Sequence, residues 1–150
     1  MTDIMVTVLL IGDSRFLGDT SQSALMTAGF DILTAEDGAE GVRMANASVP
    51  DVILLDLMMP SDDGLSVLRD LKSSSRTQKI PILILSSNEG DDDIITALAS
   101  GATGFIPKNA LSVANLVIEL QQLMRPAGYL VLARRSREWL AHVNPYRYAG

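Results

Sequence analysis

The sequence contains no cysteine and only one histidine, His142, among its 150 residues. A disulfide framework and a thiolate metal site are therefore impossible. His142 lies in the C-terminal tail and is not a candidate phosphodonor unless a helical bundle surrounds it. The apolar runs reach about eight residues, whereas a helix that spans a bilayer needs about 20. Met1-Thr2-Asp3 lacks the basic flank of a secretory signal. These absences favour a cytoplasmic protein without membrane contact.

Charge is distributed unevenly along the chain. The net charge is −6, yet residues 125–150 carry five arginines and a single glutamate. The acidic body argues against direct nucleic-acid binding, which depends on basic surfaces. The basic segment is a linker, a docking segment or a solubilising tail, and solvation is the commonest role of such segments. Leu132, Trp139 and Leu140 fall on one helical face there, which favours an extra amphipathic helix.

Five apolar runs alternate with five stretches of helical pattern. The runs are nearly continuous, as in strands of a parallel sheet that is covered on both faces. We expect strands near 6–11, 31–34, 52–56, 82–85 and 104–106, and helices near 15–28, 38–47, 64–74, 91–100 and 111–124. Strict alternation predicts an α/β fold, doubly wound, with right-handed crossovers.

Polar side chains stand just after four of these strands, namely Asp13, Asp56, Ser86 and Lys108. Ligands of open α/β sheets bind beyond the carboxyl ends of the strands. Two acids, a hydroxyl and an amine at that edge predict a small site for a phosphoryl group and a metal ion. Singly, each residue has a simpler interpretation: Asp13 is a good helix cap, Ser86 a strand-end hydroxyl and Lys108 an exposed lysine.

Together these residues resemble the receiver domain of bacterial response regulators, the chemotaxis regulators among them. The motifs are Asp56-Leu57-Met58-Met59-Pro60 with Asp63-Gly64, Gly101-Ala102 with Gly104-Phe105-Ile106, and the serine and lysine after their strands. The resemblance implies a flavodoxin-like, five-stranded parallel sheet of order 2-1-3-4-5. We expect the receiver domain over residues 3–125, with 126–150 as a basic C-terminal extension.

The resemblance implies a role for each residue of the site. Asp56 corresponds to the phosphoryl acceptor, and Asp13, Asp56 and the main-chain carbonyl of Met58 correspond to the Mg²⁺ ligands. Mg²⁺ keeps several waters, so few protein ligands suffice. Ser86 and Lys108 correspond to the groups that bind phosphoryl oxygens.

The family also implies partners and a conformational switch. Phe105 takes the place of the aromatic residue that rotates between states, although packing in the core is its larger energetic role. A histidine kinase or a phosphotransfer protein would supply the phosphoryl group. A downstream protein, or a second copy of the chain, would bind the face formed by the fourth helix, fifth strand and fifth helix.

Three positions depart from the family pattern or stand out beside it. Gly12 replaces the first of two adjacent acids, one that mostly reaches Mg²⁺ through water, and such losses cost about 10–100-fold in metal affinity. We therefore expect weakly bound Mg²⁺.

Asn109 replaces a proline whose bond to the lysine is usually cis. A cis bond before asparagine costs about 2.5–4 kcal/mol, so we expect a trans bond and a rearranged loop. Arg15 either substitutes for part of the metal charge or is simply solvated at a helix start.

Two functions remain open, and an enzyme is not expected. The chain is a response regulator receiver phosphorylated on Asp56, or an atypical module that signals by protein contact without phosphorylation, as Gly12 and Asn109 favour. Phosphatases with an aspartate nucleophile need a second aspartate two residues later, where this chain has Met58. The sequence contains no glycine-rich nucleotide-binding loop.

Overall fold

The computed structural model describes residues 5–15, 17, 19–59, 63–86, 91–108 and 111–124. The chain divides into two compact units, Met1–Asn109 and Ala110–Gly150. The first unit contains five strands and four helices, and the described part of the second is a helix. No helix within the described ranges has the length and apolarity that a membrane crossing requires.

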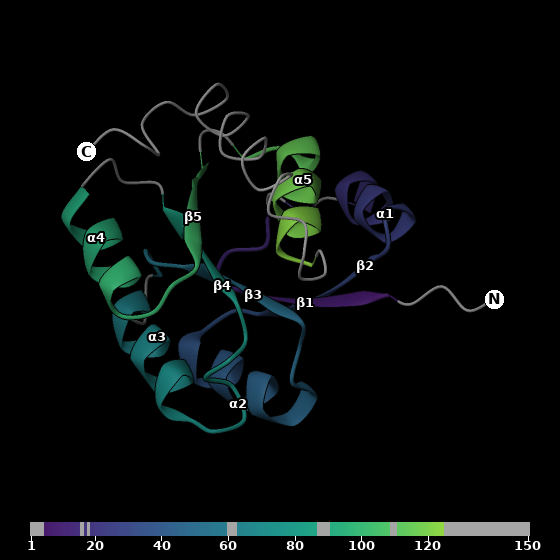
Figure 1. Ribbon diagram of the computed structural model, residues 1–150. Coiled ribbons are helices and arrows are strands. Elements are labelled where there is room, and N and C mark those ends of the chain that lie inside the picture. Colours follow the sequence, from purple (N-terminus) through teal and green to yellow (C-terminus); the bar gives the residue numbers. More distant parts are fainter. Residues whose placement is uncertain are drawn as a thin grey trace. The chain divides into compact units, whose positions relative to one another are not determined.

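Strands and helices alternate along the chain as the sequence predicts (Figure 1). The strands are β1 Val6–Ile11, β2 Phe30–Ala35, β3 Val52–Asp56, β4 Ile82–Ser86 and β5 Gly104–Pro107. The helices are α1 Asp19–Thr27, α2 Gly38–Ser48, α3 Gly64–Ser73, α4 Asp91–Ala99 and α5 Val113–Leu123.

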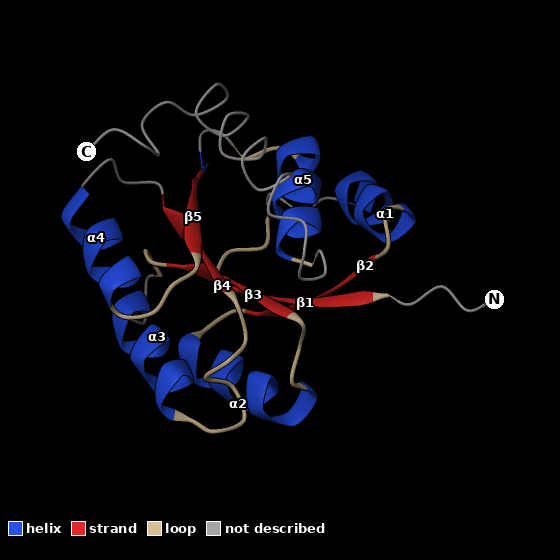
Figure 2. Ribbon diagram, viewed as in Figure 1, coloured by secondary structure: helices blue, strands red, loops and turns tan. Residues whose placement is uncertain are grey.

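The strands form one parallel sheet in the order β2-β1-β3-β4-β5, which confirms the predicted flavodoxin-like topology. In the first unit, α1 lies on one side of the sheet and α2, α3 and α4 lie on the other (Figure 2). Each connection crosses from one parallel strand to the next through a helix, as parallel pairing requires. The carboxyl ends of the strands therefore meet at a common edge.

The core lies on both faces of the sheet. Leu9, Ile53 and Ile82 belong to the cluster that packs under the helices of one face, together with Val67 and Leu68 of α3. Their strand neighbours, which point to the opposite face, are equally buried. Burial on both faces explains why the strands read as continuous apolar runs rather than as alternating ones.

The first helix begins later than the sequence pattern indicates. We expected it to begin near Arg15, but α1 begins at Asp19. Before this helix, Arg15 N–H donates to Oδ1 of Asp13 and Leu17 N–H donates to the carbonyl of Ser14, each at 2.9 Å. Gly29 ends the helix as expected, with a φ of 100°. The predicted extra helix after residue 125 and the predicted trans bond at Asn109 lie outside the described residues.

The end of α2 places a branched side chain in an unfavourable backbone conformation. Val49 has φ 44° and ψ 68°, and its N–H donates to the carbonyl of Ala45, which closes the helix. The left-handed region crowds Cβ against the backbone, and most helices that end this way use glycine there. The Val49 side chain is exposed, so little burial offsets this strain.

We therefore expect Val49→Gly to raise the free energy of unfolding by about 1 kcal/mol, because glycine adopts positive φ without steric cost. Urea denaturation followed by circular dichroism measures the change. Val49→Ala is the matched control, since it removes the branch but retains Cβ and should gain much less. Equal effects of the two substitutions would contradict the backbone explanation.

Candidate functional site

Asp56 is the last residue of β3, a central strand with neighbours on both sides. Its side chain is only 2% exposed. The register pairs Asp56 with Leu85 on β4, so that Ser86 is the next residue along that strand at the same edge. A carboxylate in such a place is costly unless it is paired with a cation and hydrogen-bonded.

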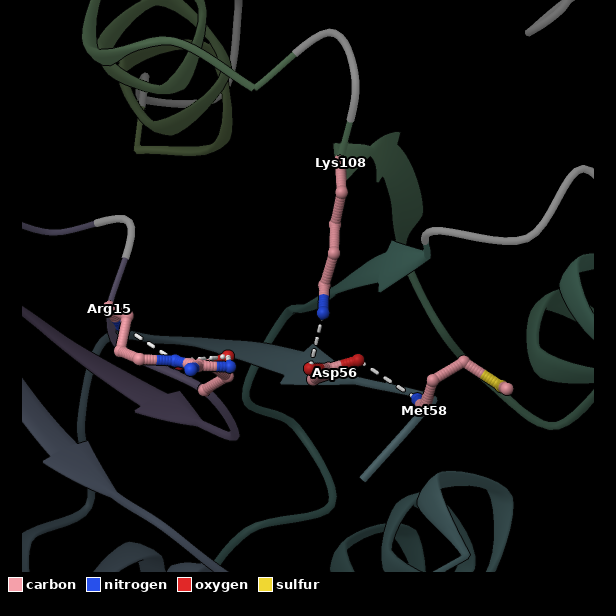
Figure 3. A network of polar contacts seen from close by, with 5 residues as sticks. Arg15, Asp56, Met58 and Lys108 are labelled. Carbon is pink, nitrogen blue, oxygen red and sulfur yellow. Dashed lines mark hydrogen bonds and ion pairs between the residues drawn. The ribbon is translucent and has the colours of Figure 1, made fainter. Parts of the chain in front are cut away.

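Lys108 provides that cation from the residue after β5. Its Nζ lies 2.6 Å from Oδ2 of Asp56, and its side chain is 28% exposed (Figure 3). The pair spans β4, which lies between β3 and β5 in the sheet. Removal of one partner from a buried ion pair costs about 3–5 kcal/mol, so the two residues depend on each other. The structure thus brings Asp56 and Lys108, which the sequence places at the same edge of the sheet, into direct contact.

The loop after β3 supplies the second contact to Asp56. The backbone N–H of Met58 donates to Oδ1 at 2.9 Å (Figure 3). Met58 also forms a bridge with Asp63, whose carboxylate accepts from Leu65 N–H and caps α3. A Cβ at Gly64 would lie 2.5 Å from the Cα of Leu57, so only glycine lets the loop return this closely.

Ser86 and Phe105 occupy the positions that the sequence predicts for them. Ser86 ends β4, pairs with Pro107 of β5 and is 3% exposed. Phe105 lies on β5 opposite Ile84 and belongs to the buried core. Both residues therefore lie near the carboxyl edge of the sheet, where Asp56 is. Ser86 is on the neighbouring strand β4, and Phe105 is on β5, one strand further along.

Gly12 lets the backbone after β1 approach the side chain of Asp56 closely. Its φ is 136°, and its N–H donates to the carbonyl of Ala35 at 2.8 Å. A Cβ built at this position would overlap the Cβ of Asp56 and lie 3.2 Å from its Oδ2. The backbone after β1 therefore packs directly against the Asp56 side chain. An acid cannot be restored here without a shift of the backbone.

Asp13 is not the cap of the first helix, contrary to one of the two interpretations of this residue. Its Oδ1 accepts the backbone N–H of Arg15 at 2.9 Å, and its two carboxylate oxygens accept from the Arg15 guanidinium. The shortest of these contacts joins Nη2 and Oδ2 at 2.6 Å. These hydrogen bonds, from the side chain first and the backbone second, lower the pKa of Asp13 from 3.8 to about 2.

The oxygen donors that the sequence predicts for Mg²⁺ are of the right chemical type. Two carboxylates and a main-chain carbonyl are the hard ligands that this ion prefers. Within the described ranges, however, no three side chains of His, Cys, Asp or Glu gather to hold a metal ion. Asp13 faces a guanidinium and Asp56 an ammonium. The donors at positions 13, 56 and 58 fit the ion, but both carboxylates already have a cationic partner.

The comparisons with known proteins agree with the fold. Residues 8–121 match the response regulator receiver domain family. The transcriptional regulatory protein PrrA of Mycobacterium tuberculosis is 34% identical over 121 residues, which cover 81% of this chain and 51% of PrrA. The chain thus spans about half the length of such curated relatives.

Solved structures give the same result. The chemotaxis protein CheY4 of Vibrio cholerae is 29% identical with a TM-score of 0.71, over 80% of this chain and 99% of CheY4. The signal receiver domain of a DNA-binding response regulator from Colwellia psychrerythraea is 27% identical with a TM-score of 0.68, over 79% and 97%. This chain belongs to the response regulator receiver domain family. Receiver domains are signalling modules and generally not catalytic enzymes.

Sequence reasoning missed two features of the site. It treated Gly12 only as a lost acid, whereas the structure shows a close approach to Asp56. It placed Arg15 at a helix start, whereas this arginine lies in a turn and binds Asp13. Asp13 and Arg15 stand two residues apart in the sequence, but a helix, which was expected here, does not bring residues with that spacing together.

We expect Gly12→Ala to destabilise the protein more than Gly29→Ala. Both glycines have positive φ, but a Cβ at Gly29 meets no atom within 4 Å. Gly29→Ala therefore measures the backbone cost alone, whereas Gly12→Ala adds an overlap with Asp56 worth about 1–3 kcal/mol. Urea unfolding of the two variants provides the comparison. Equal losses would show that position 12 does not pack against Asp56.

We also expect the carboxyl group of Asp13 to titrate near 2 in protein free of divalent metal, below the ordinary 3.8. Because the folded-state pKa is the lower one, the stability from this pair is present above the unfolded-state pKa and is lost as pH falls from 3.8 to about 2. A ¹³C carboxyl titration by NMR measures the pKa.

Two matched variants test whether Arg15 causes the lowered pKa of Asp13. Arg15→Gln should return the pKa of Asp13 toward 3.8, because the first cause of the shift is the Arg15 side chain. Lys79→Gln removes the same charge before β4, at the opposite edge of the sheet, and should leave the pKa near 2. An unchanged pKa in Arg15→Gln would rule out the guanidinium contact.

Proposed function

We propose that this chain accepts a phosphoryl group on Asp56 from a histidine kinase or a phosphotransfer protein. One observation carries the proposal, namely a buried carboxylate at the carboxyl edge of a receiver sheet with Lys108 Nζ 2.6 Å away. Family membership supports it, because receivers act with histidine kinases. An oxygen of Asp56 attacks phosphorus, the P–N bond of the phosphohistidine breaks, and the histidine nitrogen takes the electron pair.

The residues around Asp56 have distinct parts in this proposal. Lys108 neutralises the buried carboxylate before transfer and binds a phosphoryl oxygen afterward, when the group carries a charge near −2. Ser86 donates a hydrogen bond to another phosphoryl oxygen. Asp13, Asp56 and the carbonyl of Met58 would hold Mg²⁺ weakly, and the ion would supply positive charge that offsets the charge of the transferring group.

The output of the proposed switch is a change in protein binding. Lys108 directly follows Pro107, the last residue of β5, so a new partner for its ammonium alters the end of that strand. Helix α4 exposes Ile95 and Leu98, at 61% and 41%, which suits a surface that contacts a protein. We assign the partner, or a second copy of the chain, to a face that includes α4 and β5.

The second candidate is an atypical receiver that signals by protein contact without phosphorylation. The Asp13–Arg15 pair and the close packing of Gly12 on Asp56 favour it, because both leave the metal ligands engaged. In this case the Asp56–Lys108 pair is permanent and structural. Substitution of Asp56 would then alter stability without abolishing a regulated response.

Beryllofluoride, which mimics a phosphoryl group on aspartate, distinguishes the two. With Mg²⁺ present, we expect a ¹⁹F NMR signal of bound beryllofluoride and amide shifts at Asp56, Ser86 and Lys108, and EDTA should remove both. Asp56→Asn should abolish the adduct, whereas Asp70→Asn, which changes an exposed aspartate of α3, should retain it. Absence of an adduct at saturating Mg²⁺ would favour the second candidate.

A further inference from the structure

Arg15 contacts Asp13 with more groups than an incidental surface pair uses. Its Nε lies 2.9 and 3.0 Å from the two carboxylate oxygens, its Nη2 lies 2.6 Å from Oδ2, and its backbone N–H lies 2.9 Å from Oδ1. Both oxygens of the carboxylate thus accept hydrogen bonds from one residue. A guanidinium holds a carboxylate in this forked manner and stays charged at every physiological pH.

The charges of the site balance without a metal ion. Asp13 and Asp56 carry two negative charges, and Arg15 and Lys108 carry two positive ones, in two ion pairs of 2.6 Å. A divalent cation that enters this group of side chains is attracted less than by the two carboxylates alone, because the two cationic side chains offset their charge. The second acid that the family usually supplies is Gly12 here, so no further carboxylate restores a negative balance.

We propose that Arg15 is an internal cation that competes with Mg²⁺ for Asp13 and thereby sets the metal affinity of the site. The inference rests on the proposed function in that Asp13 is taken as the metal ligand. The Arg15 side chain is 90% exposed and that of Asp13 39%, so the pair can open toward solvent when an ion arrives. An exposed pair of this kind lowers the affinity of a competing ion by at most about fivefold.

The test is a Mg²⁺ titration of the full chain without any phosphoryl mimic. Calorimetry and the NMR shifts of the backbone amides near Asp13 and Met58 measure the binding. We expect Arg15→Gln to bind Mg²⁺ about five- to tenfold more tightly than the unaltered protein, because it removes both the competitor and a positive charge. Arg15 is exposed, so the variant should fold, and circular dichroism checks this.

Two controls make the result specific. Lys79→Gln removes one positive charge from the loop before β4, at the opposite edge of the sheet, and should leave the affinity unchanged. In an Asp13→Asn background, Arg15→Gln should give no comparable gain, because the carboxylate for which the two cations compete is gone. A gain of the same size in that background would overturn the proposal.

The outcomes separate this inference from the proposed function. Unchanged or weaker Mg²⁺ binding by folded Arg15→Gln overturns the competition, whatever the beryllofluoride experiment gives. Tighter Mg²⁺ binding by Arg15→Gln, with no adduct on Asp56 in either protein, supports the competition and counts against phosphorylation.

Discussion

The buried ion pair between Asp56 and Lys108 is the contact on which the rest of the site depends. A carboxylate that is 2% exposed at the end of a central strand needs a cation, and the chain provides it from two strands away. The ion pair reaches across β4, and this is possible because β3, β4 and β5 are parallel neighbours that end at one edge of the sheet. The sheet order thus brings Asp56 and Lys108 together, and the pair joins β3 to β5, the strand beside the proposed protein-binding surface.

The surroundings of this pair distinguish the chain from the common receiver pattern. Gly12 brings backbone against the Asp56 side chain where the family places an acid, and Arg15 engages Asp13. Both features reduce the negative charge that attracts a divalent ion. They act in the same direction, and both lower the affinity that we expect for Mg²⁺.

The described part of the molecule contains the receiver domain. The matched residues cover about half of the curated relative PrrA, so that protein carries further residues beyond the receiver. In the proposed function, a change at Asp56 reaches β5 through Lys108 rather than through the backbone of β3. A small site can therefore alter a protein-binding face without rearrangement of the buried core.

The sequence by itself predicted the fold and the strand ends at which the site residues lie. Continuous apolar strands, regular helical stretches between them and polar residues at strand ends follow from local pattern, which is why the order of elements and the positions of Asp56, Ser86 and Lys108 were predicted correctly. The positive φ of Gly12 and the turn that folds Arg15 onto Asp13 were not predictable. They depend on how the segment after β1 packs against a side chain more than forty residues away, and only the tertiary structure decides that contact.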